Sequence, residues 1–228
     1  MKNRRHLAAV FLVLLCLIPQ YTAQTAEPSV ALTFDDGPAG RITEKLLDAL
    51  AERNVRATFF LCCYRMESYP AVVQKMAQDG HEIGIHGCSH LYFTQMPKDK
   101  LQAEIACTAN TIKNLAGTVP SLLRPPGGLY NETVRRTAEE AGLSILLWSV
   151  DPEDWDPAMR RRTVRHVVTK AKHGDIILLH DLSEENITAA LEIVDMLTKK
   201  GFRFCTVSEL AELNGQMIEA GKIYRQFS

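Results

Sequence analysis

Ionisable side chains in this 228-residue chain stand where short apolar runs end. Asp35 and Asp36 follow an apolar run that ends at Phe34, His86 ends a second run, and His180 ends a third. Neighbouring carboxylates and imidazoles suit hydrolysis assisted by a metal ion, in which the ion activates a water and a carboxylate takes its proton. The residue types therefore indicate a hydrolytic site before any fold is considered.

His86 and His90 have the spacing that brings two imidazoles to the same side of a helical turn. With Asp36 they form a set of two histidines and one carboxylate, which suits a divalent ion. The histidine spacing alone is moderate evidence, because histidines on a helix surface show it too. The adjacent carboxylate of Asp35 strengthens the interpretation, since a cation relieves the repulsion between two neighbouring anions. A surface turn is the alternative for Asp-Asp-Gly-Pro, but it does not account for the apolar run before it.

Alternating β-rich and amphipathic runs must position these residues. We expect seven strands, at 30–34, 57–61, 82–86, 122–125, 144–149, 175–180 and 202–206. Apolar side chains at helical spacing predict helices over 42–50, 72–77, 101–112, 131–141, 158–172, 184–199 and 208–213. This alternation predicts a parallel α/β fold, either an open doubly wound sheet or a closed barrel. No Gly-x-Gly-x-x-Gly follows the first strand, which disfavours a dinucleotide-binding fold.

The carboxyl ends of parallel strands converge on one face, where ligands bind. Two more predicted strands end next to polar residues of interest: Arg124 and Gly127 follow one, and Asp151, Asp154 and Trp155 follow the other. We therefore expect all of these side chains to share one site.

Five segments of the chain resemble, in order, the motifs of the polysaccharide deacetylases with a NodB homology domain, carbohydrate esterase family 4. The segments are Thr33-Phe34-Asp35-Asp36-Gly37-Pro38, His86-Gly87-Cys88-Ser89-His90, Arg124-Pro125-Pro126-Gly127-Gly128, Asp151-Pro152-Glu153-Asp154-Trp155 and Leu178-Leu179-His180. Five motifs in order are far more specific than any one motif. The resemblance covers the chain from about residue 30 to about residue 213 and implies a distorted (β/α)7-type barrel with its active site at the C-terminal face of the strands.

The resemblance also implies an activity, the metal-dependent removal of acetyl groups from polysaccharide, and a role for each residue. The implied metal ligands are Asp36, His86 and His90. The implied catalytic residues are Asp35 as base, Arg124 to orient it, His180 as general acid and Asp151 to tune that acid. The implied substrate-binding residues are Gly127, whose N–H serves the oxyanion, and Trp155 and Leu178, which line the acetyl pocket.

Two positions depart from the family pattern. Gly87 stands where a serine or threonine usually helps to hold the metal-binding loop. Gly127 replaces the usual aromatic residue, which predicts a lower wall of the substrate groove. Cys88 also lies between the two histidine ligands, where it could form a disulfide, bind metal adventitiously or simply pack, and packing is the expectation.

The first 26 residues have the features of a targeting segment. A basic start precedes an uncharged apolar run over 7–18, which is shorter than the roughly 20 residues that span a bilayer as a helix. We expect a signal peptide over 1–26, with an uncleaved anchor as the alternative, a deacetylase domain over 27–213 and a loosely packed tail over 214–228. The protein would then act outside the cytoplasm, secreted or associated with the cell envelope.

The chain has 26 Lys and Arg against 27 Asp and Glu, so it lacks the basic field of a nucleic-acid-binding protein. We expect a monomer that meets a membrane only if its N-terminal segment is retained. Its expected partners are an acetylated polysaccharide, foremost peptidoglycan or chitin-like N-acetylglucosamine, and one divalent ion, Zn²⁺ ahead of Co²⁺ or Mn²⁺. A catalytically silent glycan-binding protein of the same fold is the alternative. A non-haem iron oxygenase shares the metal triad but requires neither a second carboxylate nor His180.

Overall fold

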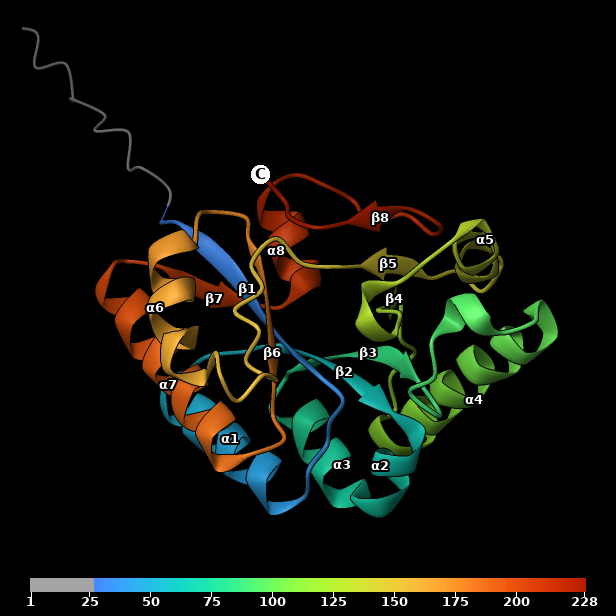
Figure 1. Ribbon diagram of the computed structural model, residues 1–228, viewed down its shortest axis with the longest axis horizontal. Helices are drawn as coiled ribbons and strands as arrows, with labels where there is room; N and C mark the ends of the chain where they lie inside the picture. Colours follow the sequence, from blue (N-terminus) through green and yellow to red (C-terminus); the bar gives the residue numbers. More distant parts are fainter. Residues whose placement is uncertain (1–26) are drawn as a thin grey trace, which may run out of the picture.

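One sheet of parallel strands forms the centre of the fold in a computed structural model, which describes residues 27–228 (Figure 1). The predicted signal peptide, 1–26, lies outside the described residues. The strands are β1 (Ser29–Asp35), β2 (Thr58–Cys62), β3 (Glu82–Gly87), β4 (Leu122–Leu123), β5 (Ser144–Leu146), β6 (Ile176–His180), β7 (Arg203–Cys205) and β8 (Ile223–Tyr224). Their order is β6-β1-β2-β3-β4-β5-β8, and β7 pairs with the first residues of β1. Every pair is parallel.

Helices cover the outer face of this sheet (Figure 1). They are α1 (Arg41–Glu52), α2 (Cys63–Ser68), α3 (Pro70–Gln78), α4 (Lys98–Ala116), α5 (Glu132–Glu140), α6 (Arg160–Lys170) and α7 (Glu184–Lys199). The remaining helix, α8 (Val207–Leu213), lies on the inner side of the sheet. Helix α8 packs differently, because its Val207 and Leu210 belong to a second apolar cluster with Ala31 of β1 and Phe60 of β2. Between residues 27 and 228, no helix has the length and apolar character needed to cross a bilayer.

The alternation of side chains along β1 decides which residues face inward. Leu32 and Phe34 belong to the large outer cluster between sheet and helices, whereas Ala31 belongs to the inner cluster with α8. Because successive side chains of a strand point to opposite faces, Thr33 and Asp35 share the inner face with Ala31. The inner face is therefore apolar where β1 begins and polar where it ends.

The segment after β5 returns to β6 and bends the sheet towards a barrel. Val150 forms a parallel bridge with Ile177, and the Leu178 N–H donates to the Val150 carbonyl at 3.0 Å. The predicted fold, a distorted barrel of parallel strands, is confirmed.

Three expectations from the sequence were wrong. The tail 214–228 is not loose, because β8 pairs with β5 and Phe227 is fully buried; a two-residue strand is too short to give a periodic signal. Helix α2 begins directly after β2, where no helix was predicted. Cys88 does not simply pack but forms a disulfide with Cys63, because the ends of the neighbouring strands β2 and β3 bring the two residues together.

Candidate active site

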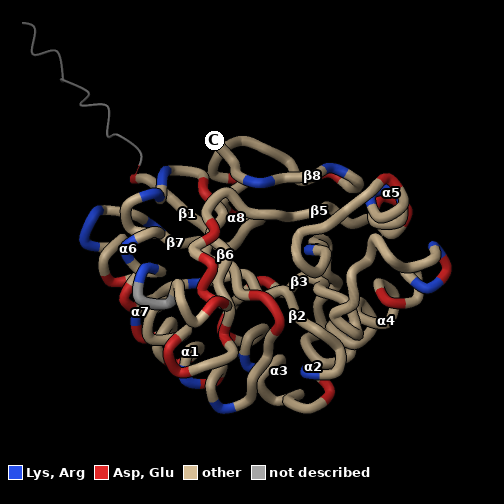
Figure 2. Tube along the Cα trace, viewed as in Figure 1, with Lys and Arg blue, Asp and Glu red and all other residues tan. Residues whose placement is uncertain are grey.

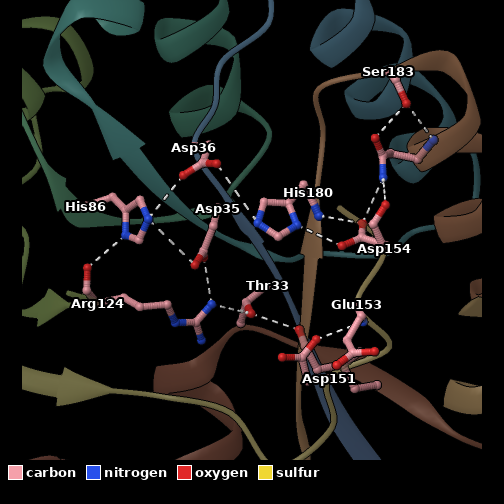
Figure 3. Close-up of polar contacts among 12 residues, drawn as sticks. Thr33, Asp35, Asp36, His86, Arg124, Asp151, Glu153, Asp154, His180 and Ser183 are labelled. Atoms are coloured by element: carbon pink, nitrogen blue, oxygen red, sulfur yellow. Dashed lines mark hydrogen bonds and ion pairs between the residues drawn. The ribbon is translucent and has the colours of Figure 1, made fainter. Parts of the chain in front are cut away.

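Five of the predicted site residues meet at the carboxyl ends of β1, β3, β4 and β6 (Figure 3): Asp35, Asp36, His86, Arg124 and His180. Asp35 ends β1 directly beside His180, its register partner at the end of β6. His86 lies near the end of β3, and Arg124 follows β4. Parallel pairing thus brings together side chains that are as much as 145 residues apart.

The carboxylate of Asp36 lies between two imidazoles. Its Oδ1 is 3.1 Å from His86 Nε2 and 2.9 Å from His90 Nε2, and it is buried without a hydrogen-bond partner among the described residues. His86 Nδ1 is 2.8 Å from the Arg124 carbonyl oxygen, which accepts a hydrogen bond from the Nδ1–H group. In this tautomer the lone pair of Nε2 faces Asp36. The unpartnered oxygen and the two ring nitrogens fit a divalent ion, since this is a donor set that zinc accepts.

Backbone and charge both mark these ligand positions as unusual. Asp36 and His90 have φ angles of 72° and 58°, a region that costs a non-glycine residue about 1–3 kcal/mol and is concentrated at functional sites. Burial by itself would raise the pKa of Asp36, but the imidazoles of His86 and His90 lower it well below the usual 3.8. Figure 2 shows acidic residues near the middle of the view and most Lys and Arg around the rim, a distribution that favours a bound cation.

Gly37 allows the turn after Asp36 to approach β6 closely. A Cβ at residue 37 would lie 2.6 Å from Asp181 Oδ1, so any larger residue there would have to displace the Asp181 carboxylate. Asp181 accepts a hydrogen bond from the Thr43 hydroxyl of α1, and burial raises its pKa to about 6. The carboxyl group of Asp181 therefore packs directly behind the turn that carries the two predicted catalytic carboxylates.

A fully buried arginine holds Asp35. Arg124 has no exposed surface, and its Nη1 donates to Asp35 Oδ1 and to Thr33 Oγ1, both at 2.7 Å. Its other nitrogens donate to the carbonyls of Leu146 and Leu147 at 3.0 and 2.9 Å. Burial lowers the pKa of Arg124, and the charge of Asp35 opposes this effect. The guanidinium is thus satisfied on three sides and fixes the position of the Asp35 carboxylate.

Asp154, and not Asp151 as expected, supports His180. Asp154 Oδ1 lies 2.7 Å from His180 Nδ1, and its Oδ2 accepts the His180 backbone N–H at 2.9 Å and the Asn186 amide at 2.9 Å. Burial alone would lower the pKa of His180, but the hydrogen bond and the charge of Asp154 overcome it and raise the pKa to about 9. His180 therefore carries a proton at neutral pH.

The prediction for Asp151 was wrong because its side chain turns to its own loop (Figure 3). Asp151 Oδ1 accepts the Glu153 N–H at 2.8 Å, an interaction that favours a tight turn. Glu153 then has a φ of 56°, and this turn directs Asp154 towards β6. Both aspartates belong to the same short motif, and nothing in the residue types tells which one reaches the histidine.

The residues predicted to bind substrate lie in different environments. Leu178 is buried on β6 two residues before His180, hence on the same face of the strand. Trp155 is 61% exposed beside Asp154, and Gly127 has a φ of 63° in the turn after Arg124.

Tyr92 was not predicted as a site residue, because nothing along the chain relates it to Gly127. A Cβ at residue 127 would lie 3.1 Å from the Tyr92 ring. An aromatic ring thus stands beside Gly127, at the position for which a low wall was predicted.

A divalent-ion triad beside a second carboxylate and a protonated histidine, at the strand ends of a parallel α/β barrel, defines a metal-dependent hydrolase. The chain belongs to the polysaccharide deacetylase family, whose model matches residues 22–146. It is 41% identical over 189 residues to a peptidoglycan-N-acetylglucosamine deacetylase of Bacillus cereus, covering 81% of this chain and 88% of that protein.

Two further relatives extend the comparison. The peptidoglycan-N-acetylmuramic acid deacetylase PdaC of Bacillus subtilis is 36% identical over 196 residues, which are 85% of this chain but 41% of that protein. A family 4 acetyl xylan esterase from Clostridium thermocellum, solved with a cobalt ion, has a TM-score of 0.81 and 33% identity over 87% of this chain and 98% of that chain. The relatives of this chain are thus named for the removal of acetyl groups from different sugars.

Proposed function

We propose that this polysaccharide deacetylase removes acetyl groups from N-acetylglucosamine units of peptidoglycan. The observation that carries the proposal is the position of Asp36, whose Oδ1 faces His86 and His90 while Asp35 and His180 stand on either side. The deacetylase of Bacillus cereus that is named for this sugar matches the chain over most of its own length, which supports this substrate.

The first half of the proposed reaction uses Asp35. A divalent ion held by Asp36, His86 and His90 would lower the pKa of a water and polarise the acetyl carbonyl. Asp35 is positioned to take a proton from the attacking water, because the Arg124 guanidinium holds its carboxylate in place through a hydrogen bond.

The second half uses His180. Its proton, held at neutral pH because its pKa is about 9, passes to the departing amine of the sugar. The Gly127 backbone N–H, in the turn that follows Arg124, serves the oxyanion of the tetrahedral intermediate. Acid and base thus stand on neighbouring strands, so that one removes a proton while the other supplies one.

We infer that the native ion is zinc, because two imidazoles and one carboxylate are a common catalytic zinc set. The cobalt ion in the acetyl xylan esterase supports the presence of a metal ion at the corresponding site of this chain. Peptidoglycan lies outside the cytoplasmic membrane, and the basic and apolar N-terminal segment supports export to that compartment.

Acetate release from purified peptidoglycan tests the activity. We expect metal-free protein to be inactive, and protein with one equivalent of Zn²⁺, Co²⁺ or Mn²⁺ to release acetate. Binding of the glycan by metal-loaded protein without any acetate release would refute the proposal and support a catalytically silent glycan-binding protein.

Mass analysis of digested cell walls tests the substrate. Loss of one acetyl group from N-acetylglucosamine residues is the expected result, and loss from N-acetylmuramic acid would refute the sugar assignment. Chitin oligomers and acetylated xylan serve as comparison substrates, because they offer the same reacting group on other chains.

A further inference from the structure

The loop over residues 87–90 follows His86 and carries His90. Its first residue is Gly87, which has no side chain. Gly87 has a φ of 100°, and a Cβ there would lie 2.9 Å from Phe93 Cε1. His90 itself has a left-handed φ of 58°. A loop in this conformation must be held by groups from outside it, because the backbone alone does not favour it.

One outside group is the carboxylate of Glu104 on α4. Its Oε2 accepts the backbone N–H of Cys88 at 2.6 Å and that of Ser89 at 3.0 Å. Hydrogen bonds to an ionised carboxylate are stronger than those between neutral groups. Glu104 thus fixes two consecutive peptide units between the histidine ligands, and it has no other role in the site described above.

The second outside group is covalent. Cys88 Sγ is bonded to Cys63 Sγ, and Cys63 is the first residue of α2. The loop is therefore attached to α2 by the disulfide and to α4 by Glu104. We call the disulfide and the Glu104 carboxylate together the loop brace.

A third cysteine lies beside this disulfide. Cys107 is an exposed free thiol on α4, its Sγ is 4.0 Å from Cys63 Sγ, and all three sulfur atoms lie within 4.8 Å of one another. They share a surface pocket lined by Cys63, Tyr64, Glu67, Cys88, Ser89 and Cys107. The remaining free cysteines of the described chain, Cys62 and Cys205, are buried.

We propose that the loop brace positions His86 and His90 for the metal, and that thiols open it and thereby lower metal affinity. In the internal route, the Cys107 thiolate attacks Cys63 Sγ, a Cys63–Cys107 bond forms, the Cys63–Cys88 bond breaks, and Cys88 takes up the proton that Cys107 released. No oxidant or reductant is consumed. The proposal rests on the proposed function of the metal site and adds to it a control by thiol–disulfide exchange at the loop.

Metal titration of oxidised and reduced protein tests the brace. A phosphine reduces the disulfide to two thiols, taking the oxygen of one water as it is oxidised, and is then removed under argon. Groups that orient metal ligands typically contribute about 10- to 100-fold to affinity. We expect Co²⁺ to bind about 10- to 100-fold more weakly to the reduced protein, with circular dichroism unchanged. Co²⁺ also reports thiolate coordination by its intense near-ultraviolet absorption, which would reveal ions captured by the opened cysteines.

Matched variants separate the parts of the brace. The double variant Cys63→Ser/Cys88→Ser should bind Co²⁺ weakly with or without reductant. Glu104→Ala should weaken binding with the disulfide intact, and Glu104→Gln, which keeps one acceptor oxygen, should restore part of it. Cys107→Ser should bind like the wild type when oxidised but never yield the Cys63–Cys107 peptide that mass spectrometry detects in wild type at mildly alkaline pH.

The outcomes distinguish the brace from the proposed function. Equal Co²⁺ affinity of oxidised and reduced wild type overturns the brace alone, because acetate release would continue. Failure of the oxidised wild type to bind metal or release acetate overturns the brace and the proposed function together. Absence of the Cys63–Cys107 peptide in the wild type overturns the internal route.

Discussion

Replacing Asp154 with asparagine removes the charge that keeps His180 protonated. The pKa of His180 is about 9 against a usual 6.5, although burial alone would lower it. Since one pKa unit corresponds to about 1.36 kcal/mol, Asp154 and its neighbours favour the imidazolium by about 3 kcal/mol. In Asp154→Asn the pKa should fall to about 6.5 or below.

The consequence for catalysis depends on pH. At pH 8 His180 is about 90% protonated with a pKa of 9 but about 3% protonated with a pKa of 6.5, so kcat/KM should fall about 30-fold. At pH 6 the same reasoning predicts less than a twofold loss. The alkaline limb of the kcat/KM profile reports this group in the free enzyme and should move from near pH 9 to near pH 6.5.

The free energy of unfolding should depend on pH through the same pKa of His180. Because the pKa of His180 is raised in the folded state, its pair with Asp154 stabilises the fold fully below about pH 6.5, and this contribution is lost as the pH rises through about 9. The variant should therefore be less stable than wild type at pH 6 and approach it above pH 9, as urea unfolding at several pH values would show.

Asp151→Asn is the matched control, since it makes the same change three residues earlier without touching His180. Its alkaline limb should stay near pH 9. An unmoved limb in Asp154→Asn, or an equal movement in Asp151→Asn, would refute the assignment of Asp154.

Four other substitutions have defined outcomes. Asp35→Asn should lower kcat by about 10²- to 10⁴-fold and keep zinc affinity, measured by calorimetry; loss of zinc binding would contradict its role as base. Arg124→Met should destabilise the fold by about 3–5 kcal/mol in urea unfolding, since it leaves a buried carboxylate unpaired. Phe227→Ala should cost about 3–5 kcal/mol in the same assay, whereas a loss below about 1 kcal/mol would mean a loosely held tail. Tyr92→Ala should raise KM for polymeric glycan more than it lowers kcat, and the reverse would place the ring at the reacting group.

The sequence predicted those parts of the site that depend on strand ends and short spacing. The run before Asp35 is apolar, which marks a buried strand. The spacing of His86 and His90 correctly paired the two histidines, but they lie at the end of β3 and in the loop after it, not on the helical turn that the spacing predicted. Asp154 could not be distinguished from Asp151, because a local turn at Glu153 decides which carboxylate faces β6.

Contacts between elements distant along the chain were beyond prediction for another reason. The Cys63–Cys88 bond depends on β2 lying beside β3, and the Glu104 contact depends on how α4 packs against that pair. Neither partner has a local signal, since each cysteine follows an apolar run or lies in a loop like any packing residue. The five cysteines at positions 62, 63, 88, 107 and 205 allow many pairings, and only the strand order selects one.

Arg124 links the metal ligands to the base in two separate ways. Its main-chain carbonyl accepts the His86 Nδ1 proton, while its guanidinium donates to Asp35. A substitution of the Arg124 side chain removes the contact with Asp35 and keeps the main-chain carbonyl that holds His86. Arg124→Met should therefore lose most of its activity at nearly unchanged zinc affinity, provided the backbone after β4 stays where it is. If zinc affinity fell together with activity, the buried guanidinium would also have to hold that backbone, through its hydrogen bonds to Leu146 and Leu147.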